Sequence, residues 1–242
     1  MNDPMKTPFP PGVREALCEA APDVFEAART RRSIRAYTSD PVPIETLREI
    51  IAIARYAPSG SNIQPWRVHV LTGAALKRLS DALVQEFLSG RPEERDYKYY
   101  TDPIEEPYLA RRRQCGWGLY TTLEIRRGDF EKSKAYRKRN YEFFGAPAGL
   151  VFSIDRKLER GSWLDYGMFI QTIMLAARAK GLHTCPEASI SNYPDVVRRE
   201  LGIGDDLIVI CGMALGYADA GDVINTFQPK RIGLEDFAVF LD

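Results

Sequence analysis

The sequence of 242 residues offers little that could build a metal centre or a disulfide framework. Its four cysteines lie far apart with no C-x-x-C spacing, and its two histidines stand alone, so neither a structural zinc site nor a disulfide scaffold is expected. Lysines and arginines number 33 and so do the acidic residues; without a basic excess, a nucleic-acid or anionic-membrane partner is not favoured. No apolar run reaches the roughly 18 residues of a membrane span.

Several sequence motifs are also missing. No G-x-G-x-x-G follows a strand, and there is no G-x-S-x-G, H-E-x-x-H or P-loop, which excludes the usual signatures of a Rossmann nicotinamide site, an esterase, a zinc protease and a P-loop NTPase. The first residues contain prolines among acidic residues where a signal peptide needs a basic start and an apolar run. We therefore expect a cytoplasmic protein with reduced thiols.

With 242 residues, of which 45% are apolar, the chain can bury one full core. We therefore expect a single domain over residues 1–242. Within it we predict an N-terminal extension at 1–20 and a helical insertion or cover at 89–145. Helical and strand-like periodicities occur along the whole chain, which indicates mixed α and β structure. The predicted helices are 22–29, 44–57, 76–87, 108–125, 130–144, 163–180 and 194–201, and the predicted strands are 66–72, 148–155 and 206–219.

The run "RRSIR" concentrates positive charge after the first predicted helix. If this segment is extended, Arg31, Ser33 and Arg35 point to one side, because alternate side chains of a strand share a face. The planar donor fork of arginine matches phosphate oxygens, and each such charge-assisted bond contributes about 1.5–3 kcal/mol. The alternative is that Arg31 and Arg32 only cap the preceding helix, where cations suit the dipole. A small donor such as Ser33 between two guanidiniums argues against simple capping.

Three other segments are ambiguous when taken one at a time. "PSGSNIQPW" (58–66) supplies hydrogen-bonding groups for a flat heterocycle, or is only a turn. "CPEASI" (185–190) is expected to be a loop whose amides are free to donate to a ligand, or an ordinary connection. Lys230 and Arg231 form a basic pair near the C-terminus, which is commonly solvated surface.

In this order and at these separations, the four segments resemble the FMN-dependent nitroreductase family from about Phe25 to the C-terminus. The middle of the chain looks like its nitrobenzoate-reductase branch. One departure is Gln228, where that branch leads us to expect a further arginine. The FMN-binding residues that the resemblance implies are Arg31, Arg32, Ser33, Arg35, Pro58, Ser59, Gly60, Asn62, Gln64, Pro186, Glu187, Ala188, Ser189, Lys230 and Arg231.

The resemblance also implies a fold and an assembly. The family fold is α+β with three layers, in which a mixed, mainly antiparallel sheet lies between helices. Its members are intertwined homodimers with two FMN sites at the interface, so Pro58 and Ser59 are expected to reach the flavin of the partner subunit. The apolar segment 163–180 is expected to be buried, and it suits a dimer core because obligate interfaces resemble divided protein cores.

The chemistry implied by the resemblance is a ping-pong cycle through one slot. NAD(P)H gives hydride to flavin N5 and leaves, and a nitroaromatic or quinone-type acceptor then takes its place. The backbone amide of Ala188 or Ser189 is expected near N5, and Arg35 near N1 and O2, where its charge stabilises the reduced ring. No side-chain acid or base is expected to be essential.

A polar loop at 90–102 contains three tyrosines. Tyr97, Tyr99 and Tyr100 could stack over a bound ring as substrate or lid residues, or could simply pack. Two alternatives to nitroreduction stay open, because one fold hosts several reactions. The first is a flavin-dependent reductive dehalogenase, for which no convincing lid lysine is found, or another reductase on this fold. The second is a non-catalytic FMN carrier or sensor.

Overall fold

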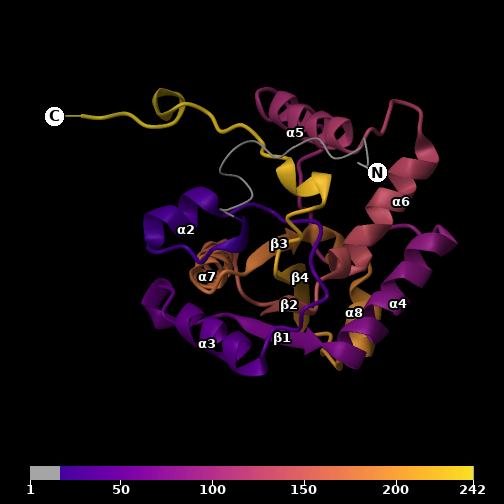
Figure 1. The fold of residues 1–242 in the computed structure, drawn as a ribbon. Coiled ribbons are helices and arrows are strands. Elements are labelled where there is room, and N and C mark those ends of the chain that lie inside the picture. The colour runs from indigo at the N-terminus through magenta and orange to yellow at the C-terminus, as the bar shows by residue number, and fades with distance from the viewer. Residues whose placement is uncertain (1–16, 242) are drawn as a thin grey trace.

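The computed structural model describes residues 17–241. Within them, four strands form one sheet that lies between two groups of helices (Figure 1). The strands are β1 (Arg67–Thr72), β2 (Ala148–Asp155), β3 (His183–Glu187) and β4 (Leu207–Gly216). The helices are α2 (Val24–Thr30), α3 (Ile44–Ala54), α4 (Gly73–Ser89), α5 (Tyr108–Thr122), α6 (Phe130–Tyr141), α7 (Arg160–Ala179) and α8 (Pro194–Leu201).

The order of strands across the sheet is β1-β2-β4-β3, and every neighbouring pair is antiparallel. The two central strands, β2 and β4, are buried along almost their whole length, as expected for strands covered on both faces. An isolated parallel bridge joins Ser33 to Thr184 of β3. This bridge brings the N-terminal arginine run to one edge of the sheet.

Apolar side chains hold helices against both faces of the sheet. On one face, Leu47 of α3 and Phe169 of α7 pack with Phe152 of β2 in a single buried cluster. On the other face, Leu79 of α4 and Val196 of α8 are buried with the opposite side of β2 and β4. Each fully buried side chain of this size contributes roughly 1.5–3 kcal/mol. The predicted α+β fold with three layers is confirmed.

The sequence predicts most of the elements correctly, including the N-terminal helix, which spans Val24–Thr30. The segment 185–190 is an exception, because it is not a loop. Its first half belongs to strand β3, and the rest lies in a 3₁₀ helix, Ala188–Asn192. Pro186 argued against a strand in the sequence, because proline lacks a backbone donor. Proline is tolerated mainly in edge strands, and β3 is an edge strand of the four-stranded sheet.

The region predicted as an insertion, 89–145, contains an irregular stretch followed by α5 and α6. In Figure 1, α5 lies at the top of the view and α6 lies next to α4. Of the predicted N-terminal extension, residues 1–16 lie outside the described residues. The segment predicted to be buried, 163–180, has one face in the core, whereas Leu164 and Met168 are 74% and 40% exposed. Among residues 17–241, no helix combines the length and the hydropathy that crossing a membrane would need.

Candidate functional site

The arginine run is extended, as its alternating pattern predicts. Helix α2 ends at Thr30, and the backbone N–H of Arg31 donates to Ala27 O at 3.0 Å. The backbone N–H of Ile34 donates to Thr184 O at 3.2 Å. Arg31 therefore caps α2 through its backbone, whereas the alternative interpretation assigns the capping to the cationic side chains of Arg31 and Arg32.

Arg31, Ser33 and Arg35 all lie near the buried thiol of Cys185 in β3. Burial raises the pKa of this thiol to about 12, and the three residues lower it by a smaller amount. The guanidinium Nη1 of Arg35 also donates to Ser33 O at 3.1 Å, and the Arg35 guanidinium lies 6.0 Å from the ring centroid of Phe144. The sequence pattern correctly predicted that these three side chains share a face.

Positive charge in this cluster is not balanced. Burial lowers the pKa of the Arg31 guanidinium, and its nearness to Arg231 lowers that pKa further. Arg231 comes from the far end of the chain, and its Nη1 donates to Pro229 O at 3.0 Å. Within the described residues, no carboxylate forms an ion pair with Arg31, Arg35 or Arg231. Cations left without a counter-charge make a site for an anion.

Arg32 has a different environment from its neighbours. Its buried guanidinium donates to Asn225 O at 3.4 Å, and the amide oxygen of Gln228, oriented toward it, accepts from Arg32 Nη1 at 2.8 Å and also from Nη2. Asn225 in turn accepts from the backbone N–H of Arg35 at 2.9 Å and donates to Ala36 O at 2.8 Å. Gln228 thus serves as the acceptor for Arg32, a role that a further arginine could not fill.

Asn225 is a residue that sequence reasoning missed, and it fixes the backbone of the arginine run. No motif marks it. Its position becomes meaningful only because the chain segment after β4 returns to the beginning of the domain.

The loop at 58–66 is shaped by its own hydrogen bonds. Ser59 Oγ accepts from the Gln64 backbone N–H at 3.0 Å, and Gln64 Nε2 donates to Asn62 O at 3.1 Å. The buried carboxylate of Asp165 in α7 accepts from the Gly60 backbone N–H at 3.1 Å. Asp165 is the second residue that the sequence patterns did not reveal, since it lies within an otherwise apolar helix.

Most of this loop is exposed, including Pro58, Gly60, Asn62 and Gln64. Among the described residues, no hydrogen bond or ion pair joins it to Arg31–Arg35 of the same chain. Within one chain, therefore, neither a hydrogen bond nor an ion pair between described residues links these two predicted parts of the site.

A cavity of about 510 Å³ lies between the end of β3 and the tyrosine-rich loop. Pro186, Glu187 and Ala188 line one part of it, and Tyr97 and Tyr99 line another. The remaining lining residues are Lys98, Trp163, Tyr166, Gly167, Ile170, Ile210 and Cys211. A cleft with aromatic walls beside a few polar groups is typical of a site for a small organic ligand.

The three tyrosines differ in how they are held. Tyr97 donates its hydroxyl proton to Ile210 O at 2.6 Å and its ring lies 4.8 Å from that of Trp163, so it is fixed to the body of the domain. Tyr99 packs edge-on against Tyr100, which is 53% exposed and does not line the cavity. The structure thus places two of the three predicted ring-stacking tyrosines at the cavity.

Glu187 is a buried acid beside the arginine run. It is 3% exposed, and neither carboxylate oxygen has a hydrogen-bond partner at bonding distance among the described residues. Burial raises the pKa of Glu187 well above its ordinary value, while Arg35 and the Ala214 backbone N–H lower it less. Glu187 therefore keeps its proton at pH values where an exposed glutamate has lost it.

We expect Glu187→Gln to stabilise the protein increasingly as pH rises. The folded state holds a proton that the unfolded chain releases above about pH 4.3, so the wild type loses stability as pH rises from there toward the raised folded pKa. Glutamine has no such proton. Urea unfolding from pH 4 to pH 8 should give free energies that diverge between the two proteins toward pH 8. The divergence is about 1.4 kcal/mol for each tenfold difference in proton affinity between the folded and unfolded states.

The matched control for this test is Glu131→Gln, which removes an exposed acid on α6. The curve for Glu187→Gln should diverge from the wild type toward pH 8 by more than the curve for this control does. Equal divergence of the two variants would mean that the buried carboxyl ionises normally.

Among residues 17–241, no three histidine, cysteine or carboxylate side chains are grouped as a metal site would require.

Comparison with known proteins shows which family the chain belongs to. The model of the Nitroreductase family matches residues 28–217. Chloronitrobenzene nitroreductase of Comamonas testosteroni is 40% identical over 223 residues, which cover 91% of this chain and 98% of that protein. Nitrobenzene nitroreductase of Ectopseudomonas oleovorans is 39% identical over 224 residues, which cover 91% of this chain and 98% of that protein.

A solved structure agrees with these relatives. The FMN-dependent nitroreductase NfnB from Mycobacterium smegmatis, in complex with NADPH, superposes with a TM-score of 0.86 at 35% identity, covering 91% of this chain and all of that one. Both the sequence and the fold place this chain in the nitroreductase family.

Proposed function

We propose that this protein is an FMN-dependent NAD(P)H oxidoreductase that reduces nitroaromatic and related acceptors. One observation carries the proposal, namely the cations without an ion-pair partner among the described residues: Arg31 and Arg35 near Cys185 of β3, and Arg231 near Arg31. Family membership supports it, as do the relatives named for nitrobenzene reduction and the neighbour solved with NADPH. The predicted cytoplasmic location stays a prediction.

The residues present fit FMN chemically. A phosphate monoester carries nearly two negative charges at neutral pH, and Arg31 with Arg231 supplies two cations without a carboxylate to neutralise them. The flat ring of a flavin suits a cavity walled by Tyr97, Tyr99 and Trp163. Arg32 is already engaged by Asn225 and Gln228, so we assign it a structural part in holding the run.

When bound, FMN would supply hydride transfer, first from NAD(P)H and then to the acceptor, in a ping-pong cycle. The chain itself would hold and polarise that group. Arg31 and Arg231 would bind the phosphate, and Arg35 would place a positive charge where the reduced ring becomes negative. The backbone amide of Ala188 or Ser189 would orient the ring.

Flavin analysis and a spectrophotometric assay together test the proposal. The purified protein should release FMN on denaturation and should oxidise NADPH or NADH when nitrobenzene or 4-nitrobenzoate is supplied. A protein that binds FMN without consuming either nucleotide with any acceptor would be a carrier or sensor. Reduction of iodotyrosine in preference to nitroarenes would indicate the dehalogenase. A colourless protein that takes up no FMN would overturn the proposal.

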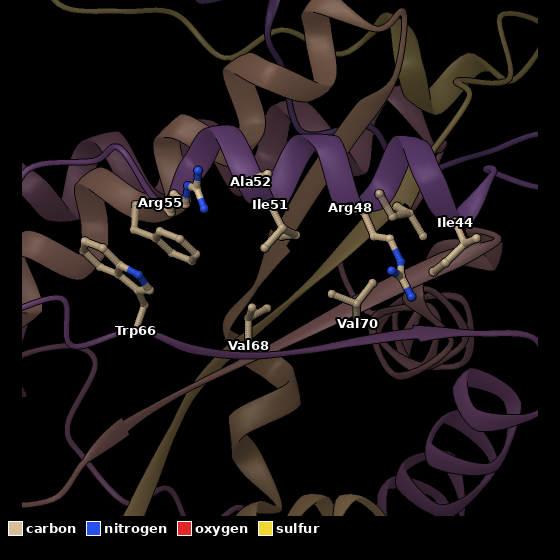
Figure 2. Close-up of a pocket in the computed structure, with 10 residues that line it drawn as sticks. Ile44, Arg48, Ile51, Ala52, Arg55, Trp66, Val68 and Val70 are labelled. Carbon is tan, nitrogen blue, oxygen red and sulfur yellow. The ribbon is translucent and has the colours of Figure 1, made fainter.

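The site is also proposed to be shared between two copies of the chain. An apolar groove of about 370 Å³ lies between α3 and β1, and its walls include Ile44, Ile51, Val68 and Val70 (Figure 2). Strand β1 is the outer strand at this end of the four-stranded sheet, so its free edge can accept a further strand.

The C-terminal segment has the complementary character. Residues 233–241 extend away from the rest of the chain in Figure 1, and Phe237, Val239 and Phe240 are 66%, 83% and 80% exposed. Contiguous exposed apolar side chains of this kind mark an interaction site. Glu235 and Asp236 also complement the charge of the two arginines of the groove, Arg48 and Arg55.

We infer that the C-terminal segment of one subunit binds the α3–β1 groove of the other, in an intertwined homodimer. Leu164 and Met168, one helical turn apart on the outer face of α7, are further exposed apolar residues that a second copy would cover. In such a dimer the exposed loop at 58–66 would complete the flavin site of the partner subunit.

A further inference from the structure

A second cavity, of about 320 Å³, lies between α5 and the segment 227–232. Its lining includes three cationic side chains, those of Arg111, Lys230 and Arg231. The other lining residues are Gln114, Cys115, Gly118, Phe227, Gln228, Pro229 and Ile232. Arg111 belongs to the "RRR" run, which has no part in the proposed flavin site.

Arg111 lies on the side of α5 that faces the rest of the domain. Arg111, Gln114, Cys115 and Gly118 follow helical spacing on one face and all line the cavity. Gly118 fixes the approach of the helix, because a Cβ atom there would come within 2.8 Å of the Phe227 ring. The position of Arg111 over the cavity therefore follows from the packing of its own helix.

The next arginine of the run has a different partner. The guanidinium of Arg112 lies 4.7 Å from the centroid of the Tyr100 ring. Arg113 is exposed and does not line the cavity. Of the three consecutive arginines, only Arg111 is directed to the cavity by its helical position.

The charges around this cavity are of one sign. Among the described residues, no acidic side chain lies within ion-pair distance of Arg111, Lys230 or Arg231. Grouped like charges repel each other, and a bound anion removes that cost. Besides Arg231, which the proposed FMN site already uses, the guanidinium of Arg111, the ammonium of Lys230 and the amides of Gln114 and Gln228 offer donors that phosphate oxygens accept from.

We propose that this cavity binds a phosphate monoester and that Arg111 is the cation that α5 contributes to it. The proposal rests on the proposed function, which supplies two such groups, the 5′-phosphate of FMN and the 2′-phosphate of NADPH. Arg31 and Arg231 already balance the charge of one phosphate. Arg111 and Lys230 remain for a second one, so the 2′-phosphate of NADPH is the source that the charge count favours.

The test compares Arg111→Gln with Arg113→Gln, which removes the same charge from the same helix outside the cavity. The flavin-loaded proteins are titrated with adenosine 2′-monophosphate by calorimetry, and adenosine serves as the reference without a phosphate. Adenosine 2′-monophosphate should bind Arg111→Gln roughly 10- to 100-fold more weakly than it binds Arg113→Gln. In steady-state assays kcat/KM for NADPH should fall by a similar factor, whereas kcat/KM for NADH stays unchanged. Arg111→Lys should recover part of the loss.

A second arm distinguishes the two sources of phosphate. Apo-protein is titrated with FMN and with riboflavin, which lacks the phosphate. Arg111→Gln could reduce the ratio of FMN affinity to riboflavin affinity and leave the preference for NADPH over NADH unchanged. In that case the cavity binds the phosphate of FMN, and the proposal of a phosphate-monoester site holds. If Arg111→Gln matches Arg113→Gln in every titration, the proposal is overturned. Failure of the proposed function would appear separately, as a wild-type protein that binds no FMN.

Discussion

Replacing Arg31 and Arg231 together by alanine should yield a folded protein that binds FMN at least about 100-fold more weakly than the wild type. Each charge-assisted bond to a phosphate contributes about 1.5–3 kcal/mol, and about 1.4 kcal/mol corresponds to a factor of ten in affinity. Folding should survive, because Arg31 caps α2 through its backbone N–H, which alanine retains. Fluorescence titration of the apo-protein with FMN measures the loss, and circular dichroism checks the fold.

Two controls make this result specific. Riboflavin lacks the phosphate, so its affinity should change much less than that of FMN. Arg29→Ala removes a nearby cation whose partner is Glu26 on the surface of α2, and it should bind FMN normally. Wild-type flavin content in the Arg31→Ala, Arg231→Ala protein would show that the phosphate is held elsewhere.

Removing residues 234–242 should convert the proposed dimer to a monomer and should weaken FMN binding at the same time. The truncated chain loses the exposed apolar side chains Leu234, Phe237, Val239, Phe240 and Leu241, which we propose to fill the α3–β1 groove of the partner. Sedimentation velocity gives the oligomeric state, and flavin released per chain gives the occupancy. A shared site predicts that the dimer and the bound flavin are lost together.

A full-length variant tests the same contact without shortening the chain. Phe237→Ser with Phe240→Ser keeps the length but removes two aromatic contacts, and it should also favour the monomer. Phe130→Ser is the control, because Phe130 is 80% exposed on α6, away from the proposed interface. A stable wild-type monomer that retains tightly bound FMN would contradict the shared site.

The behaviour of the arginine run could be predicted before the structure. Its two-residue period separates Arg31, Ser33 and Arg35 from Arg32, and the structure gives the two sets different partners. The period sufficed because the side-chain direction in an extended segment is a local property of the backbone. The same locality explains why the sequence correctly predicted helices such as α3, whose apolar stripe recurs at helical spacing.

Other parts of the site could not be predicted, because their partners are distant in sequence. Asn225 holds Arg32 and Arg35 from about 190 residues away, and Asp165 anchors Gly60 across 105 residues. Neither residue belongs to a motif. Gln228 looked like a departure from the family pattern until the structure placed its side-chain amide against Arg32, where its oxygen can accept from the guanidinium.

Periodicity and composition thus determined the class of fold, most of its helices and strands, and which arginines share a face, since these depend on neighbours a few positions apart. Only the tertiary structure decided that the segment after α7 is an edge strand, that the carboxyl of Glu187 is enclosed without a partner among the described residues, and that Arg111 shares a cavity with Lys230. Burial and charge balance are set by which distant segments pack together, and no local pattern of the chain encodes that packing.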